Sequence, residues 1–191
     1  AWQGQVRYGL AWHGSAGDNP QMMARSHGPG GALAFLVGAP LVMPTSYAVM
    51  LAPVAAVAAL GPDIDHASAW LSVRVPWLSW LVRLVTTHRH ETHSALSIPI
   101  VGALAIALTI WWAPLGWSLA VGTAVALGWS VHIVQDLITD RGVVFWWPWS
   151  RRRVFLLPKR LRITTNGLAE KVLRYIMWLS FIGFEFVRYW S

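Results

Sequence analysis

The chain has no cysteine and few charged residues. Its 191 residues include 15 Lys plus Arg and 8 Asp plus Glu, so charged residues make up 12% of the sequence, against about 25% in an ordinary soluble domain. Without cysteine there are no disulfides, thiolate metal sites or cysteine nucleophiles, and any metal must be bound by nitrogen and oxygen atoms. Hydrophobic residues make up 55% of the sequence instead. This composition is typical of a membrane protein.

The basic residues and the tryptophans indicate a membrane surface. The net charge is +7, and many basic residues lie beside apolar segments, as in "RRRVFLLPKRLR" and "VRLVTTHRH". The 14 Trp residues often stand where an apolar run stops, and Trp concentrates at the level of lipid headgroups. We therefore predict a cytoplasmic rim that faces anionic lipid headgroups. No nucleic-acid-binding motif accompanies the charge, so nucleic acid is not a predicted partner.

The apolar segments predict an all-α, integral membrane helical bundle with about four to five transmembrane helices plus an interfacial helix. The segment 70–86 mixes Trp, Leu and Val with two arginines, a pattern that favours a helix lying in the interface. Prolines divide the first long apolar region into two short spans. The expected spans are 30–43, 46–60, 95–113, 117–135 and, with a less apolar pattern, 170–190.

The N-terminal residues differ from the rest in lacking a helical pattern. Residues 1–29 contain Gly, Pro and Asn with scattered aromatic residues and no apolar periodicity. We expect an N-terminal extension over 1–26, in which Met22 or Met23 is a candidate natural start, and one membrane-embedded domain over 27–191.

Successive spans that reverse direction would bring most of the His, Asp and Glu residues to one side of the membrane. The turns expected on the other side, "PTSY" and "APLG", contain no charged residue. Since the Lys and Arg residues cluster with the polar ones, the positive-inside rule places this side in the cytoplasm. The residues expected there are His27, Asp63, Asp65, His66, His88, His90, Glu91, His93, His132, Asp136 and Glu170.

A buried metal ion would explain the polar end of the most apolar helix. His132 and Asp136 are four residues apart, so both lie on one helix face, and an uncompensated carboxylate inside a membrane bundle is costly. The loop "GPDIDH" adds the oxygen atoms of Asp63 and Asp65. Imidazole and carboxylate suit zinc, manganese and related ions. A ligand set without cysteine favours a catalytic over a closed structural site.

The ordered motifs "GPDIDH", "HRHETHS" and "HIVQDLITDRGV", followed by "WWPWS", resemble those of the YdjM-type family of membrane-bound proteins, described as metal-dependent hydrolases. The resemblance covers most of the chain, from about His27 to Glu170. Two departures are Gly61, where the family usually has Leu, and the pair His90 and Glu91, where it often has a small residue. The residues that match the family pattern are His27, Asp63, Asp65, His88, Arg89, His93, Ser94, His132 and Asp136.

From these motifs we expect one or two divalent ions, zinc foremost and manganese as a second choice, and a water activated for attack on a phosphoester or related bond. The expected substrate is a membrane lipid or a lipid-linked molecule. Asp63 or Glu170 would be the general base, and Arg89 would bind a substrate phosphate. The expected metal ligands are His27, Asp65, His88, His93, His132 and Asp136.

Several alternatives stay open at the level of sequence. Intramembrane His and carboxylate residues also transport divalent metals or protons, paired histidines also bind haem, and a metal also serves as a purely structural element. His132 alone fits a hydrogen bond between helices. Asp63 and Asp65 fit helix caps, as do Thr92 and Ser94 before the third span. The sequence does not predict an oligomeric state.

Overall fold

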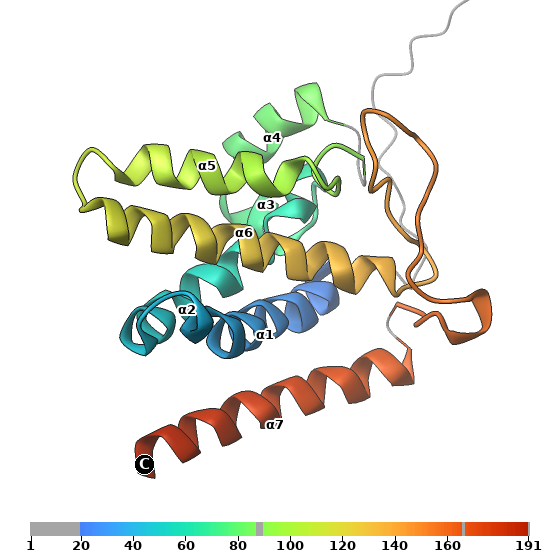
Figure 1. Ribbon diagram of the computed structural model, residues 1–191. Coiled ribbons are helices and arrows are strands. Elements are labelled where there is room, and N and C mark those ends of the chain that lie inside the picture. The colour runs from blue at the N-terminus through green and yellow to red at the C-terminus, as the bar shows by residue number, and fades with distance from the viewer. Residues whose placement is uncertain (1–19, 87–89, 166, 191) are drawn as a thin grey trace, which may run out of the picture.

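The computed structural model describes residues 20–86, 90–165 and 167–190. Within them the regular elements are helices, and a long loop precedes the last helix (Figure 1). The α-helices are α1 Pro20–Gly38, α2 Thr45–Ala58, α3 Trp70–Arg74, α4 Pro76–Val85, α5 Ser97–Thr109, α6 Leu115–Leu137 and α7 Leu168–Trp190, and the 3₁₀ helices are η1 Ala39–Leu41, η2 Pro62–Asp65 and η3 Lys159–Leu161.

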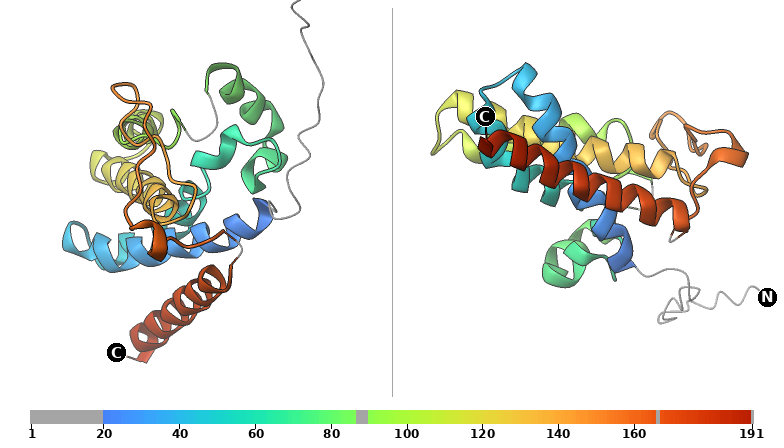
Figure 2. Two further views of the ribbon diagram at one scale, coloured as in Figure 1. Left: turned by 90° about the vertical axis from the view of Figure 1, so that its right-hand side faces the viewer. Right: turned by 90° about the horizontal axis from the view of Figure 1, so that it is seen from below.

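Helix α6 lies at the centre of the bundle. It packs against α5 on one side and against α1 and α2 on the other, whereas α7 lies along α1 at the edge of the bundle (Figures 1 and 2). The segment 138–165 loops over one end, where isolated bridges join Thr139 to Ile163 and Val143 to Val154. This arrangement brings the start of α1, the end of α2 and the end of α6 together at the same end of the bundle.

Small residues allow the central helices to approach closely. A Cβ atom at Gly31 of α1 would lie 2.6 Å from the Cβ of Ala59 and 2.8 Å from the carbonyl oxygen of Ala55. One at Gly128 of α6 would lie 3.0 Å from the carbonyl carbon of Ala55 and closer still to its oxygen. Close backbone approach through Gly and Ala is typical of helix packing in membranes, where apolar burial gives little drive. Ala55 of α2 is thus held between two glycines.

The first helix begins earlier than the sequence predicts. We expected a helix from residue 30 after an extension without periodicity, but α1 starts at Pro20 and contains Pro29. The "GPGG" sequence suggested a break because Gly and Pro are poor helix formers. In the structure, the glycines are the contact face of α1, and Pro29 removes only one main-chain donor. The first nineteen residues of the expected extension lie outside the described residues.

The expected interfacial helix over 70–86 is two helices. Pro76 forces Val75 out of the helical conformation (φ −127°, ψ 63°) and starts α4. Ser72 and Ser79 are buried and donate hydrogen bonds of 3.1 Å and 2.8 Å to the carbonyl oxygen of Ile64. The opposite face of α4 exposes large apolar side chains, including Trp77 and Trp80. Through the hydrogen bonds of Ser72 and Ser79, α3 and α4 also support η2, the turn that carries Asp63 and Asp65.

Two stretches of the described residues are long and apolar enough to cross a membrane, Thr45–Asp65 and Leu115–Leu137. Helix α5 is apolar but shorter. The all-helical fold is therefore as predicted, and the count of four to five spans is not confirmed.

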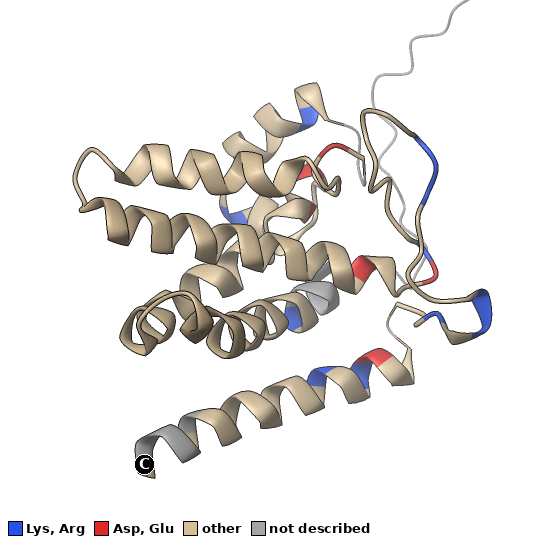
Figure 3. Ribbon diagram, viewed as in Figure 1, with Lys and Arg blue, Asp and Glu red and all other residues tan. Residues whose placement is uncertain are grey.

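Charged residues gather at one end of the bundle. In Figure 3, the ends of the helix pairs α1–α2 and α5–α6 that carry the short turns are free of Lys, Arg, Asp and Glu, and the coloured residues lie toward the opposite end or on α3, α4 and the start of α7. The parts of α1, α2, α5 and α6 that lead from this charged end to the short turns contain no charged residue; they are residues 28–38, 45–58, 97–109 and 115–131.

Candidate metal site

Six of the predicted polar residues meet at the charged end of the bundle. They come from α1, from η2 after α2, from the loop before α5 and from the last turns of α6. His93 and His132 are fully buried at 0% exposure, and none of the six exceeds 9%. The six are His27, Asp63, Asp65, His93, His132 and Asp136. Buried charged groups require compensation, so their shared location indicates a common binding function.

A main-chain carbonyl orients His132. Its Nδ1 lies 2.7 Å from the carbonyl oxygen of Ala59, which follows the last turn of α2. Since a carbonyl only accepts, Nδ1 carries the hydrogen and donates it, and Nε2 keeps its lone pair. The last carbonyls of a helix have no partner within the helix, so the same bond also caps α2.

A hydroxyl group orients His93 in the same way. Thr92 Oγ1 donates a hydrogen bond of 2.6 Å to Asp65 Oδ2, and it lies 2.9 Å from His93 Nδ1. Because its hydrogen is used toward the carboxylate, the hydroxyl accepts from His93 Nδ1. Nε2 of His93 therefore also keeps its lone pair.

An amide orients His27. The Nδ1 atom of His27 donates to Gln135 Oε1, and the amide nitrogen of Gln135 lies 3.4 Å from the carbonyl oxygen of Ser26 and 3.6 Å from the sulfur of Met177. The His27 ring stacks on that of His132 with centroids 3.9 Å apart. In all three histidines, Nδ1 thus donates to a protein acceptor.

The Nε2 atoms face one another and two carboxylates. Those of His93 and His132 are 3.2 Å apart. Asp63 Oδ1 lies 3.6 Å and 3.7 Å from them, and Asp136 Oδ2 lies 3.5 Å and 3.9 Å away. Asp136 Oδ1 is 4.0 Å from Nε2 of His27. Two imidazole lone pairs at this distance repel unless a cation lies between them.

This donor set fits a divalent metal. Ligand nitrogens about 2.0 to 2.1 Å from tetrahedral zinc stand about 3.3 Å apart, close to the observed 3.2 Å between His93 and His132. Two groups of residues have ligand atoms within 4.8 Å of one another, His27 with His132 and Asp136, and Asp63 with His93 and His132. The prediction of a possible metal site is supported, whereas the identity of the metal stays a prediction.

Asp65 lies behind His93 rather than among the facing Nε2 atoms. Its Oδ2 is 3.9 Å from His93 Nδ1 and accepts the Thr92 hydroxyl. The neighbouring carbonyl of Ile64 accepts the hydrogen bonds from Ser72 and Ser79. In this turn, Asp63 therefore faces the Nε2 atoms of His93 and His132, whereas Asp65 faces Thr92. The expected helix caps are not observed, because the cap of α3 is Ala69.

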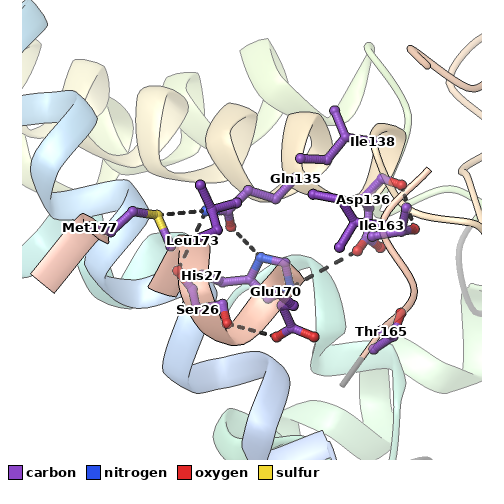
Figure 4. A pocket seen from close by; sticks show the side chains of 11 residues that line it. Ser26, His27, Gln135, Asp136, Ile138, Ile163, Thr165, Glu170, Leu173 and Met177 are labelled. Atoms are coloured by element: carbon purple, nitrogen blue, oxygen red, sulfur yellow. Dashed lines mark hydrogen bonds and ion pairs between the residues drawn. The ribbon is translucent and has the colours of Figure 1, made fainter. Parts of the chain in front are cut away.

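A pocket leads to the cluster from the side of α7. Figure 4 shows its lining, in which His27 and Asp136 lie beside Gln135, with Glu170 next to Ser26. The Ser26 hydroxyl donates a hydrogen bond of 2.7 Å to Glu170 Oε1. Glu170 is thus placed at the opening of the site, in contact with α1.

The remaining predicted residues take different positions. His88 and Arg89 lie outside the described residues. His90 is half-buried and belongs to neither ligand group. Ser94 Oγ accepts from the main-chain N–H of Ser97, the first residue of α5, but the N-cap of α5 is Leu96 and has no side-chain cap bond, so the expected cap by Thr92 or Ser94 is not observed. His66 is half-buried and lies 3.1 Å from the Ser68 hydroxyl.

Sequence reasoning missed the residues that orient the histidines. Gln135 stands beside Asp136 in the motif "VHIVQD", and Thr92 stands beside His93. Their adjacency to predicted ligands was the only available signal, because a hydrogen bond to Nδ1 depends on the tertiary arrangement. The carbonyl of Ala59 leaves no trace in the sequence.

The comparisons with known proteins agree with these motifs. The chain is 32% identical over 115 residues to the "Inner membrane protein YdjM" of Escherichia coli (strain K12) and, with the same values, to that of Shigella flexneri. The alignment covers 58% of this chain and 56% of each relative, so it spans little more than half the length of these curated relatives. No solved structure matches the chain. Because the family described as YdjM inner membrane protein matches residues 22–189, the chain belongs to that family, as its motifs predicted.

Proposed function

We propose that the chain is an integral membrane metal-dependent hydrolase, which cleaves a phosphoester or related bond of a lipid or lipid-linked substrate. One observation carries this proposal: three histidines donate from Nδ1 to protein acceptors, Nε2 of His93 and His132 faces Asp63 and Asp136, and Nε2 of His27 faces Asp136. Ligand histidines in metal enzymes are oriented in this way by outer hydrogen bonds. A set of nitrogen and oxygen donors without cysteine is also typical of catalytic rather than structural zinc.

The geometry divides the residues into ligands and supports. His27, His93, His132, Asp63 and Asp136 would hold the metal, with Thr92, Gln135 and Asp65 orienting them. The two oxygens of Asp136 face different histidines, Oδ1 toward His27 and Oδ2 toward His93. This carboxylate would therefore be able to contribute a donor atom to each of two ions. His132 belongs to both ligand groups and would contribute its Nε2 to whichever group holds the ion.

A divalent ion in this site would supply Lewis-acid chemistry, lowering the pKa of a water toward about 7 and polarising a phosphoryl oxygen. The chain supplies the rest. Glu170 accepts the proton from the attacking water at its carboxylate, and the Ser26 hydroxyl holds that carboxylate at the opening of the pocket. We retain Arg89 as the residue that binds the substrate phosphate and His88 as a further ligand.

We place the site at the cytoplasmic face of the inner membrane. The relatives are named inner membrane proteins, and two helices here are long enough to span. In the proposed topology α1, α2, α5, α6 and α7 cross the bilayer, and α3 and α4 lie in its interface. Basic residues cluster in the loop of residues 151–162 at the same end as the site, which favours contact with anionic headgroups.

Transport of metal or protons is the weaker alternative. A conduit needs polar groups at several depths of the bilayer. The donor atoms here gather at one end, and residues 28–38, 45–58, 97–109 and 115–131 carry no charged side chain. Metal uptake by proteoliposomes would favour transport over hydrolysis.

The proposal is tested by metal content and metal-dependent hydrolysis. Protein purified in mild detergent is expected to contain about one or two transition-metal ions per chain by mass spectrometry. Chelation is expected to abolish hydrolysis of a fluorescent phospholipid, and added zinc or manganese to restore it. A chelated protein that stays folded and fully active would contradict the proposal, as would purified protein that binds no metal.

The supporting residues give a second prediction. Thr92→Val removes the hydroxyl that bonds His93 and Asp65 but keeps the side-chain shape. Loss of such an outer hydrogen bond is expected to weaken metal affinity about 10- to 100-fold, as measured by competition with a chelating dye. Thr109→Val on α5 is the matched control, because its hydroxyl bonds only main-chain carbonyls of its own helix. Equal affinities for both variants would contradict the orienting role of Thr92.

A further inference from the structure

An apolar groove runs between α1, α2 and α7. Its cavity volume is about 340 Å³, at the lower end of the range of about 300 to 1,000 Å³ found for small-molecule sites. Its lining residues are all Gly, Ala, Pro, Val, Leu, Trp or Phe, including Ala32 of α1, Ala56 of α2, and Trp178 and Phe181 of α7. The groove therefore suits a hydrocarbon ligand, and it has no charged side chain with which to bind a polar one.

One end of the groove adjoins the candidate metal site. Gly28, which lines the groove, directly follows His27, and Trp178 directly follows Met177, which lines the pocket of the site. Figure 4 shows Met177 close to Gln135 and His27. From this end the groove continues along α1 and α2, past Ala32 and Ala52 to Val49. A chain lying in the groove would thus end at the cluster.

The groove also lies at the depth of the bilayer. Its α2 wall belongs to the apolar stretch Thr45–Asp65, which is long enough to cross a membrane. Inside lipid, an apolar groove gains little from the hydrophobic effect, because hydrocarbon already surrounds it. Its contribution is to hold one chain in a fixed direction relative to the site, which aligns the attached head group.

Positive charge marks the end of the groove next to the site. Arg25 is exposed on α1, one residue before Ser26, and Lys171 and Arg174 lie in the first two turns of α7. Figure 3 shows these basic residues at the site ends of both helices. An anionic head group is attracted to this position, and a cationic one is repelled.

Building on the proposed function, we infer that the substrate is an anionic glycerophospholipid whose acyl chain lies in the groove between α1, α2 and α7. The lipid enters sideways from the bilayer. Its phosphate then reaches the Nε2 atoms and carboxylates of the cluster through the pocket beside Glu170. The surrounding basic residues select the charge of the head group, and the groove selects the chain.

Photolabelling tests this inference without an activity assay. The protein is reconstituted in phosphatidylcholine vesicles containing phosphatidylglycerol with a diazirine in its acyl chain. After irradiation, adducts are expected to concentrate on the peptide with Trp178 and Phe181. Ala56→Trp places an indole in the space of the acyl chain and is expected to lower this labelling about tenfold. Ala107→Trp, at an exposed position of α5, is the matched control and should leave it unchanged.

Three results would overturn the inference. Equal labelling of all lipid-facing helices indicates annular lipid only. Unchanged labelling in Ala56→Trp places the lipid elsewhere, and equal labelling by the same diazirine on phosphatidylcholine removes the selection for an anionic head. If Ala56→Trp does not fold, Ala56→Leu and competition by unlabelled phosphatidylglycerol give the same readout. Absence of labelling on the Trp178 and Phe181 peptide in the wild-type protein rejects the groove alone, whereas hydrolysis that survives chelation rejects the proposed function alone.

Discussion

His132→Ala is expected to yield protein that binds essentially no transition metal and loses at least about 100-fold in hydrolysis. The reason is that His132 is the only residue shared by both ligand groups. Its removal leaves each group with two of three donors, and a ligand is expected to matter at least as much as the outer residues, whose loss costs about 10- to 100-fold. The measurement is metal content by mass spectrometry after gel filtration, with hydrolysis of a fluorescent phospholipid beside it.

The matched control is His66→Ala. His66 lies close in the sequence to Asp63 and Asp65 but outside both ligand groups. This variant is expected to keep its metal and its activity. Helical circular dichroism and elution volume should agree among the wild type and both variants, so that metal loss reports the site rather than the fold. His132→Ala protein with full metal content would refute the assignment.

Gly128→Ala is expected to give the largest loss of stability of any single methyl addition in α6. The new Cβ would lie 3.0 Å from the carbonyl carbon of Ala55 and 3.1 Å from its Cα, and closer to its oxygen. Because these atoms are main chain on α2, the helices must separate. Overpacking of this kind costs about 1 to 3 kcal/mol and occasionally more. The expected result is a clearly lower midpoint of thermal unfolding in detergent.

Gly116→Ala in the same helix is the control. A Cβ at Gly116 meets nothing within 4 Å, and Ala favours a helix over Gly by about 0.8 to 1 kcal/mol. This variant is therefore expected to be as stable as the wild type or slightly more stable. Equal midpoints for both variants would show that α2 and α6 do not approach as closely as described.

The helical organisation was accessible from the sequence where apolar runs were bounded by clear turns. The predicted 117–135 and 46–60 correspond to α6 and α2 within two residues at each end. The prediction for α1 was wrong at its start, because "GPGG" carries the same Gly and Pro signal whether it ends a helix or supplies a flat packing surface. Only the contacts of Gly31 with α2 distinguish the two.

The cluster was partly accessible for a simple geometric reason. Reversing helices return distant residues to the same end, and an i, i+4 pair shares a face, so His132 and Asp136 could be grouped with His27 and His93. The relative positions of Asp63 and Asp65 could not be predicted. Which of them faces the histidines depends on how η2 is held by Ser72 and Ser79, and those serines come from a segment in which we predicted a single uninterrupted helix.

The hydrogen bond from His132 to the carbonyl of Ala59 differs from the bonds that orient His93 and His27 in its sensitivity to mutation. His93 and His27 rely on the side chains of Thr92 and Gln135, which one nucleotide change can replace. A peptide oxygen is present whatever amino acid occupies position 59. No substitution at position 59 can therefore remove the acceptor that fixes the tautomer of His132, the histidine common to both ligand groups. Sequence variation should change the orientation of His27 and His93 first.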